Sequence, residues 1–227
     1  AKKIFVSSTV PKEGKTFISV NLALSYSQLN KKVLLLGFDI RNPKLSSLIQ
    51  NINANTGITN YLVSDDDSIK KYIQKSELGI DIISSGVVPP NPTELLTSSK
   101  INSIFEQLEK EYDYIIVDTA PIAIVSDTLL LAEYSDLFVY IFRHNYSDVR
   151  FITDLNENIE MGKLKNVATI LNDVAFKSGY GYYGNGSYGY GSYGYGKKYG
   201  YSYGNSENVK QNFLVKIINK LKFWKWV

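Results

Sequence analysis

The residues best suited to chemistry lie near the start of the chain, in the segment 8–16 with the sequence STVPKEGKT. This segment separates a short apolar run, Ile4–Ser7, from a helix-length stretch. It matches the phosphate-loop pattern G-x-x-x-x-G-K-[ST], except that Thr9 stands where the first glycine belongs. Backbone amides of such a loop point inward, and the positive end of the following helix adds to the attraction for phosphate. A polar turn with a chance Gly-Lys-Thr is the alternative, and the position between strand and helix favours the phosphate loop.

The ligand expected at this loop is ATP with Mg²⁺. Lys15 would act as a catalytic residue by reaching the β- and γ-phosphates, and the hydroxyl of Thr16 would join the Mg²⁺ shell. The residues expected to contact the nucleotide are Pro11, Lys12, Glu13, Gly14, Lys15, Thr16, Phe17 and Arg41. For Arg41, contact with a neighbouring subunit and a salt bridge at the entry of a helix are alternatives.

Two aspartates follow apolar runs in the manner expected of metal ligands. Asp39 comes after Val33–Leu36, and Asp118 comes directly after Tyr114–Val117. Mg²⁺ prefers oxygen ligands and keeps several waters, so one or two carboxylates with phosphate oxygens suffice. We expect both aspartates, with Thr16, at the metal, and Asp39 also as a catalytic residue. A helix N-cap or a turn residue is the alternative for either aspartate.

The elements that must position these residues alternate along residues 1–177. Short apolar runs typical of buried strands are Ile4–Ser7, Val33–Leu36, Ile80–Ile83, Tyr114–Val117, Leu137–Phe142 and Val167–Leu171. Helix-length segments lie between them, such as Thr16–Leu29, Lys100–Glu111 and Asp148–Met161. This order predicts an α/β fold of the P-loop NTPase class, with a mostly parallel β-sheet and helices on both faces. Ligands bind beyond the carboxyl ends of such strands, where the candidate residues lie.

The composition of the chain argues against several classes of site and function. The chain has no cysteine, which excludes a disulfide framework and a thiolate metal site, and His144 is its only histidine. No stretch reaches the ~18 apolar residues of a membrane span, and no signal peptide opens the chain. Because the chain begins at the threshold of a strand, we expect a soluble fragment of a longer polypeptide. Five lysines and one glutamate in residues 205–227 leave a weakly acidic body, which argues against nucleic-acid binding.

The composition changes after Lys177. From residue 179 to residue 204, ten of 26 residues are glycine and ten are tyrosine. This predicts a flexible tail over 178–206, because the segment has no aliphatic residue from which to build a core. A final block, 207–227, is basic and amphipathic, with apolar residues along one arc of a helical wheel. For residues 208–227 we leave three alternatives open: contact with a membrane surface, docking on the body or a partner, and a frayed end.

Taken together, these motifs resemble the bacterial tyrosine kinases (BY-kinases) that regulate capsule and exopolysaccharide production. The resemblance covers roughly residues 3–173 and then the tyrosine-rich tail. It includes the Walker A segment Pro11–Thr16, a Walker A′ segment ending at residues 39–43, and the Walker B segment Ile116–Asp118. It also includes the run 86–96, GVVPPNPTELL, which is similar to the family's own signature. Many unrelated NTPases share a Walker A motif, whereas this ordered set is specific.

The resemblance implies an ATP-dependent protein-tyrosine kinase that phosphorylates its own tail, between subunits of a homo-oligomer. The implied acceptors are Tyr180, Tyr182, Tyr183, Tyr188, Tyr190, Tyr193, Tyr195, Tyr199, Tyr201 and Tyr203. A transmembrane polysaccharide chain-length or export activator domain, fused or separate, is the implied partner. The implied location is the cytoplasmic face of the bacterial inner membrane. Without the kinase-like motifs, a Gly/Tyr-rich segment that associates through aromatic contacts is the alternative for the tail.

Several features depart from the family pattern. The Walker A′ segment usually carries two aspartates separated by one residue, and Gly37 stands at the first position. Lys12 replaces the glycine that usually follows the loop proline. The chain begins after the Glu/Arg-rich helix through which family members form rings, so ring formation by this fragment is not expected. The competing hypotheses are a partitioning-type P-loop ATPase, a non-catalytic nucleotide-binding assembly regulator and a housekeeping NTPase.

Overall fold

The computed structural model describes residues 2–124 and 127–174, which belong to one compact unit, Ala1–Ser178. The tyrosine-rich tail and the block 207–227 lie outside the described residues. The expectations for both therefore stay predictions, as do the domain boundaries. Within the described ranges, no helix is long and apolar enough to cross a bilayer.

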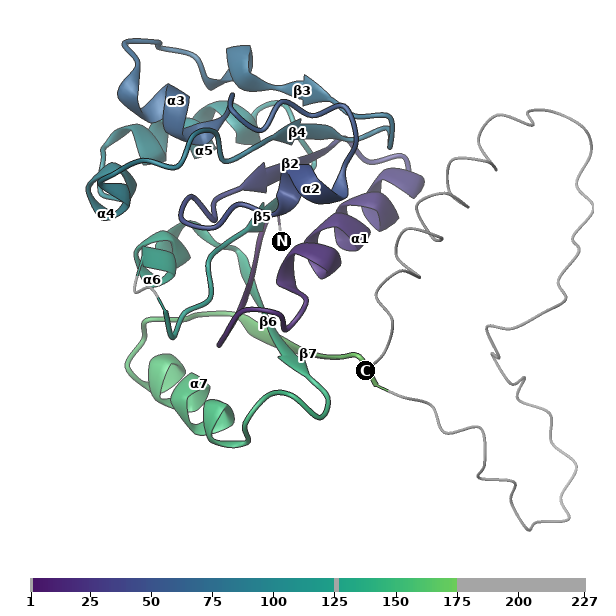
Figure 1. Ribbon diagram of the computed structural model, residues 1–227, viewed down its shortest axis with the longest axis vertical. Coiled ribbons are helices and arrows are strands. Elements are labelled where there is room, and N and C mark those ends of the chain that lie inside the picture. Colours follow the sequence, from purple (N-terminus) through teal and green to yellow (C-terminus); the bar gives the residue numbers. More distant parts are fainter. Residues whose placement is uncertain (1, 125–126, 175–227) are drawn as a thin grey trace, which may run out of the picture. The chain divides into compact units, whose positions relative to one another are not determined.

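The described residues form one seven-stranded sheet in the order β3-β4-β2-β5-β1-β6-β7 (Figure 1). The strands are β1 (Lys3–Ser8), β2 (Val33–Gly37), β3 (Gln74–Lys75), β4 (Asp81–Ile83), β5 (Tyr114–Asp118), β6 (Leu137–Arg143) and β7 (Val167–Asn172). Neighbouring strands run parallel, except that β3 is antiparallel to β4. The prediction of a mostly parallel sheet is confirmed.

Helices cover both faces of this sheet, as predicted. The α-helices are α1 (Lys15–Gln28), α2 (Leu45–Leu48), α3 (Ile58–Val63), α4 (Pro92–Leu96), α5 (Lys100–Glu109), α6 (Asp127–Leu131) and α7 (Arg150–Glu160), and short 3₁₀ turns span Ile69–Tyr72 and Ala132–Tyr134. Figure 1 shows α1 and α2 on one side of the sheet and α5, α6 and α7 on the other. Two apolar cores result, one beneath each helical layer.

The sequence explains this layering through the two-residue period of a strand. In β1, Ile4 and Val6 pack in the core beneath α1, whereas Phe5 packs in the opposite core. Helix α5 adds buried residues at i, i+3, i+4 and i+7, beginning at Ile101, which place one apolar stripe on the sheet. Burial of each such side chain contributes about 1.5–3 kcal/mol of hydrophobic free energy. The two cores therefore hold β1 and its neighbouring strands between the helical layers.

All six predicted strands are present, and the three predicted helices match α1, α5 and α7 within a few residues. The antiparallel strand β3 and the helices of four to six residues were not predicted. A helix this short has less than two turns, and a strand of two residues has at most one alternation of apolar and polar residues. Neither shows a hydrophobic period that could be detected in the sequence.

Candidate nucleotide site

The predicted site residues converge at one edge of the sheet because the strands that carry them are adjacent and parallel. Strands β2, β5 and β1 lie side by side, and Asp118 pairs in register with Gly37 on one side and Val6 on the other. The phosphate loop leaves the carboxyl end of β1, and Asp39 follows β2 by two residues. The edge is therefore the carboxyl edge at which ligands bind in such sheets.

The loop reaches the start of α1 through two residues with left-handed backbone. Lys12 has φ 71° and Gly14 has φ 101°. A Cβ atom at Gly14 would lie so close to the side-chain amide of Asn172 that this amide would have to move. The carbonyl of Gly14 accepts from Ile18 N at 2.9 Å, which begins the helical ladder. The left-handed backbone therefore favours glycine, and a larger residue would also displace Asn172.

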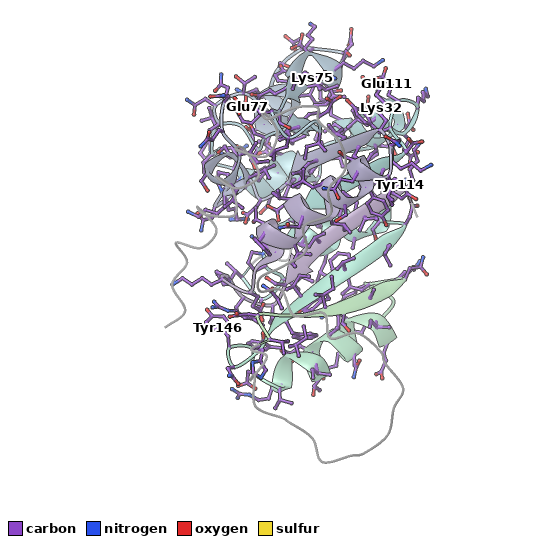
Figure 2. The ribbon with its side chains drawn as sticks, turned by 90° about the vertical axis from the view of Figure 1, so that its right-hand side faces the viewer. Lys32, Lys75, Glu77, Glu111, Tyr114 and Tyr146 are labelled. Carbon is purple, nitrogen blue, oxygen red and sulfur yellow. The ribbon has the colours of Figure 1, made fainter. Side chains whose placement is uncertain are left out.

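Residues from β6, β7 and the turn after β6 hold the loop from its outer side. Three successive loop carbonyls accept hydrogen bonds: Pro11 from Tyr146 Oη (3.1 Å), Lys12 from Arg143 Nη1 (3.1 Å) and Glu13 from Asn172 Nδ2 (2.9 Å). We call Arg143, Tyr146 and Asn172 the loop brace. Figure 2 shows Tyr146 far from Lys32 and Tyr114, which lie at the starts of β2 and β5, so the brace belongs to the carboxyl edge.

The loop brace determines where the loop amides point. In a trans peptide the N–H points opposite to the preceding carbonyl, and the described peptides are all trans. The amides of residues 12, 13 and 14 therefore face away from the brace. Within the described part of the chain, none of these three amides donates a hydrogen bond. Adjacent unpaired amides at the N-terminus of a 14-residue helix form an anion site that fits a polyphosphate.

The carboxylate of Glu13 stabilises the loop instead of facing the amides. It is fully buried and accepts from Val10 N at 2.8 Å and from the hydroxyl of Ser147. Thr9, which replaces the usual first glycine, is buried and hydrogen-bonds through Oγ1 to Tyr140 Oη at 2.8 Å. Glu13 therefore presents its backbone amide, and not its side chain, to the candidate site.

Lys15 and Asp39 form a buried ion pair at the centre of the edge. Lys15 Nζ lies 3.0 Å from Asp39 Oδ2, and the two side chains are only 11% and 5% exposed. The second oxygen, Oδ1, accepts from Asn42 N at 3.0 Å. Each group is thereby held in one orientation.

Asp118, at the end of β5, is almost completely buried. Burial raises its pKa to about 6, and the charge of Asp39 raises it further, whereas the Lys15 charge and the hydroxyls of Thr16 and Ser19 lower it. Ser19 Oγ donates to Asp118 Oδ1 at 3.3 Å. Two buried carboxylates thus share one buried ammonium.

The oxygens of Thr16, Asp39 and Asp118 fit a magnesium ion that binds together with the phosphates. One carboxylate charge has no compensating cation among the three groups, and a hydroxyl lies beside it. No group of three or more His, Cys, Asp or Glu side chains suited to a metal occurs in residues 2–124 or 127–174. Mg²⁺ does not need one, since phosphate oxygens and waters supply most of its shell.

The other predicted contacts lie at the rim. Pro11 and Lys12 are exposed and Phe17 is half-buried. Arg41 is also exposed, and its Nη2 donates to Thr93 Oγ1 at 2.8 Å. This bond connects the segment after β2 to the start of α4, within the run 86–96. Its predicted contact with the nucleotide stays a prediction.

Sequence reasoning missed the loop brace. Arg143 ends β6, Tyr146 follows it closely, and Asn172 ends β7. Polar residues at the carboxyl ends of two further parallel strands were the available signal, since every such end reaches the ligand edge.

The fold, the unpaired loop amides and the carboxylates on adjacent strands define a P-loop nucleotide-binding protein of the α/β class. A family model described as an AAA domain matches residues 1–167. Tyrosine-protein kinase CpsD of Streptococcus pneumoniae is 35% identical over 188 residues, covering 81% of this chain and 83% of the relative. The kinase domain of the Escherichia coli tyrosine kinase ETK superposes with a TM-score of 0.74 at 29% identity, covering 84% of this chain and 73% of that one.

The chain belongs to the bacterial tyrosine-protein kinase family, and the resemblance noted in the sequence is confirmed. It spans only part of some relatives: tyrosine-protein kinase ptk of Acinetobacter johnsonii is 32% identical over 180 residues, which are 79% of this chain and 24% of that protein.

Proposed function

We propose that this kinase domain binds ATP with Mg²⁺ at the loop amides and transfers the γ-phosphate to tyrosines of its own tail. The observation that carries the proposal is the set of three unpaired amides beside the buried Lys15–Asp39 pair. The ten tyrosines between residues 180 and 203 supply acceptors on the same chain.

Lys15 has two roles in this proposal. Before nucleotide binds, it neutralises Asp39. In the complex it exchanges Asp39 for oxygens of the β- and γ-phosphates, where its charge stabilises the developing negative charge of transfer. This exchange frees Asp39 Oδ2, the oxygen that Lys15 holds in the structure.

Asp39 then acts on the acceptor. A tyrosine hydroxyl has an unperturbed pKa of about 10, so it must lose its proton as it attacks. The freed oxygen of Asp39 orients that hydroxyl and accepts the proton. With Gly37 at the first Walker A′ position, Asp39 is the carboxylate of this segment that performs the step.

Thr16 and Asp118 would hold the metal, with Asp39 contributing directly or through water. When bound, Mg²⁺ supplies charge neutralisation on the phosphates. Thr16 is 8% exposed and Asp118 is 1% exposed, so both would offer their oxygens to the ion from largely buried side chains. Pro11, Lys12, Phe17 and Arg41 complete the nucleotide surface.

The tail is the proposed substrate because a flexible tether keeps acceptors at high local concentration near an active site of the same assembly. Each phosphate adds about −1.5 to −2 charges, so several phosphates convert the tail into an anionic segment. We propose that transfer occurs between subunits and that the added charge dissociates the assembly. The process controls capsular or exopolysaccharide synthesis together with a transmembrane activator at the bacterial inner membrane, where residues 208–227 are one candidate contact.

Mass spectrometry after incubation with Mg-ATP tests the proposal. Wild type is expected to gain phosphate on residues 180–203, and Lys15→Ala to gain none. Lys110→Ala is the matched control, because Lys110 is an exposed residue at the end of α5 away from the loop. Equal labelling of wild type and Lys15→Ala would point to a contaminating kinase and refute the assignment.

Mixing two complementary variants, one without the catalytic lysine and one without tail acceptors, tests transfer between subunits. One protein carries Lys15→Ala with an intact tail, and the other carries an intact site with all ten tail tyrosines changed to phenylalanine. Phosphotyrosine on the first protein only in the mixture supports transfer between subunits. Absence of phosphotyrosine in the mixture, with normal labelling of wild type, restricts transfer to one chain. A partitioning-type ATPase would hydrolyse ATP and label neither.

A further inference from the structure

A buried hydroxyl lies at the carboxyl edge beyond the residues already described. Ser85 follows β4 by two residues and is 2% exposed. Within residues 2–124 and 127–174, its hydroxyl makes no hydrogen bond. No fully enclosed polar side-chain atom in these ranges lacks a partner, so the Ser85 oxygen keeps some accessible surface. It is therefore a nearly buried hydroxyl with its hydrogen-bonding capacity unused.

The backbone around Ser85 is held firmly by the start of α3. Ile58 N donates to Ser84 O at 2.9 Å, and Thr59 N donates to Ser85 O at 3.0 Å. Gly86 follows with φ 83°, and a Cβ atom there would collide with side chains at the start of α3. The hydroxyl is therefore presented from a fixed position, as a binding group requires.

Ser85 occupies the space that a side chain at position 37 would need. A Cβ atom on Gly37 would lie 2.9 Å from Ser85 Oγ and 3.1 Å from Ser85 N. Gly37 is the last residue of β2, and Asp39 follows it by two positions. The absence of a side chain at Gly37 thus brings a neutral hydroxyl up to the strand end that leads to Asp39.

The strand order indicates where the Ser85 hydroxyl lies relative to the candidate nucleotide site. Along the edge the strand order β1, β5, β2, β4 places the phosphate loop first, then Asp118, then Asp39 and finally Ser85. The γ-phosphate lies beside Lys15 and the two aspartates in the proposed complex. Ser85 lies on the far side of Asp39 from the phosphate loop in this order, so its hydroxyl is placed to contact an acceptor that enters from that side.

We propose that Ser85 is an acceptor-binding residue whose hydroxyl hydrogen-bonds the phenolic oxygen of the incoming tyrosine and holds it beside Asp39. This inference rests on the proposed tyrosine kinase activity. Serine stays neutral and does not replace a base; Asp39 keeps that role. The substrate class that needs this contact is a tyrosine side chain in an extended, glycine-rich segment.

Steady-state kinetics on the full chain tests the contact. All ten tail tyrosines are changed to phenylalanine, and a synthetic peptide of residues 187–196, SYGYGSYGYG, is the acceptor. Ser85→Ala is expected to lower kcat/KM for the peptide about tenfold, the effect of one lost hydrogen bond. The affinity for ATP and the acceptor-free ATP hydrolysis are expected to stay at the wild-type level.

Ser84→Ala is the matched control from the adjacent position. The Ser84 hydroxyl donates away from the edge, to Thr56 O at 2.7 Å and Asn53 O at 3.1 Å. Its loss is expected to lower the melting temperature and to leave the peptide kinetics unchanged. Equal losses of peptide kinetics in Ser84→Ala and Ser85→Ala would overturn the inference, because they would indicate a general loosening of this segment.

Gly37→Ala is a second variant, in which position 85 is still serine. Its methyl group displaces the Ser85 hydroxyl, so it is expected to reproduce the peptide defect, and the Gly37→Ala/Ser85→Ala double variant to show no further loss. Wild-type kinetics in Ser85→Ala, or additive losses in the double variant, overturn the inference. A parent protein that phosphorylates no peptide at all refutes the kinase activity instead, so the two failures are distinguishable.

Discussion

Replacement of Asp118 by asparagine is expected to stabilise the protein in the absence of nucleotide while removing its activity. The pKa of Asp118 is raised from 3.8 to about 6, mainly by burial. A difference of about two pKa units corresponds to roughly 3 kcal/mol of unfolding free energy, by which the ionised carboxylate destabilises the fold near pH 7. Asparagine keeps the shape without the charge, so Asp118→Asn should recover about this amount.

The direction of the pKa shift determines how this stability penalty depends on pH. Below pH ~4 the carboxyl is protonated in both the folded and the unfolded protein, so it causes no penalty. The folded pKa lies above the unfolded one; the penalty therefore grows as pH rises from about 4 to about 6 and is complete above that range. Urea unfolding of both proteins at pH 7 and pH 4 measures this. At pH 7 the melting temperature of the variant should be higher by roughly 6–12 °C.

Asp81→Asn is the matched control for this prediction. Asp81 is also buried, but its carboxylate pairs with Lys75 Nζ at 2.7 Å and accepts from Tyr112 Oη at 2.7 Å. Removal of its charge should destabilise the protein. A gain at Asp118 that persists unchanged at pH 4, or no gain at pH 7, would refute the reasoning that desolvation of the ionised group is the cause.

Three further predictions concern the loop and the core. Asn172→Ala removes the bond to the Glu13 carbonyl and should weaken ATP binding about five- to tenfold in a fluorescent-nucleotide titration. Phe105→Ala removes a ring that stacks on Phe38 at 5.8 Å between centroids and should lower the unfolding free energy by about 3–5 kcal/mol in urea. Gly86→Ala forces a side chain into left-handed backbone and should lower the unfolding free energy by about 1–2 kcal/mol, measured by thermal unfolding; an unchanged stability would show that the backbone around residue 86 relaxes.

The part of the fold that the sequence predicted is the part with a strong hydrophobic period. Each predicted strand is an apolar run, and in the centre of the sheet such a run is buried on both faces, as in β2, where all five residues are buried. The strand order could not be predicted, because β1 pairs with β5 and β6 across more than 100 residues and no local pattern encodes that pairing. Strand β3 was not predicted, because its two residues show no alternation of apolar and polar side chains.

The residues of the candidate site also fall into two groups, those that a local sequence pattern identifies and those that only the assembled sheet brings together. Lys15, Thr16 and Asp118 were found because a local motif and the end of a strand identify them. The bonds of Arg143 and Asn172 to the loop, and the position of Ser85 against Gly37, depend on which strands become neighbours. Such contacts are properties of the assembled sheet, so they appear only in the structure.

The loop brace also sets a limit on when the phosphate loop can acquire its shape during synthesis. The loop occupies residues 11–16, yet one of the three groups that orient its carbonyls ends β7, the last strand of the described residues, at Asn172. A nascent chain that has not yet released this residue from the ribosome lacks that contact, however early β1 and α1 form. The loop therefore acquires its full set of brace contacts only after β7 has been synthesised, and under the proposed function ATP would stabilise the domain fully only from that point.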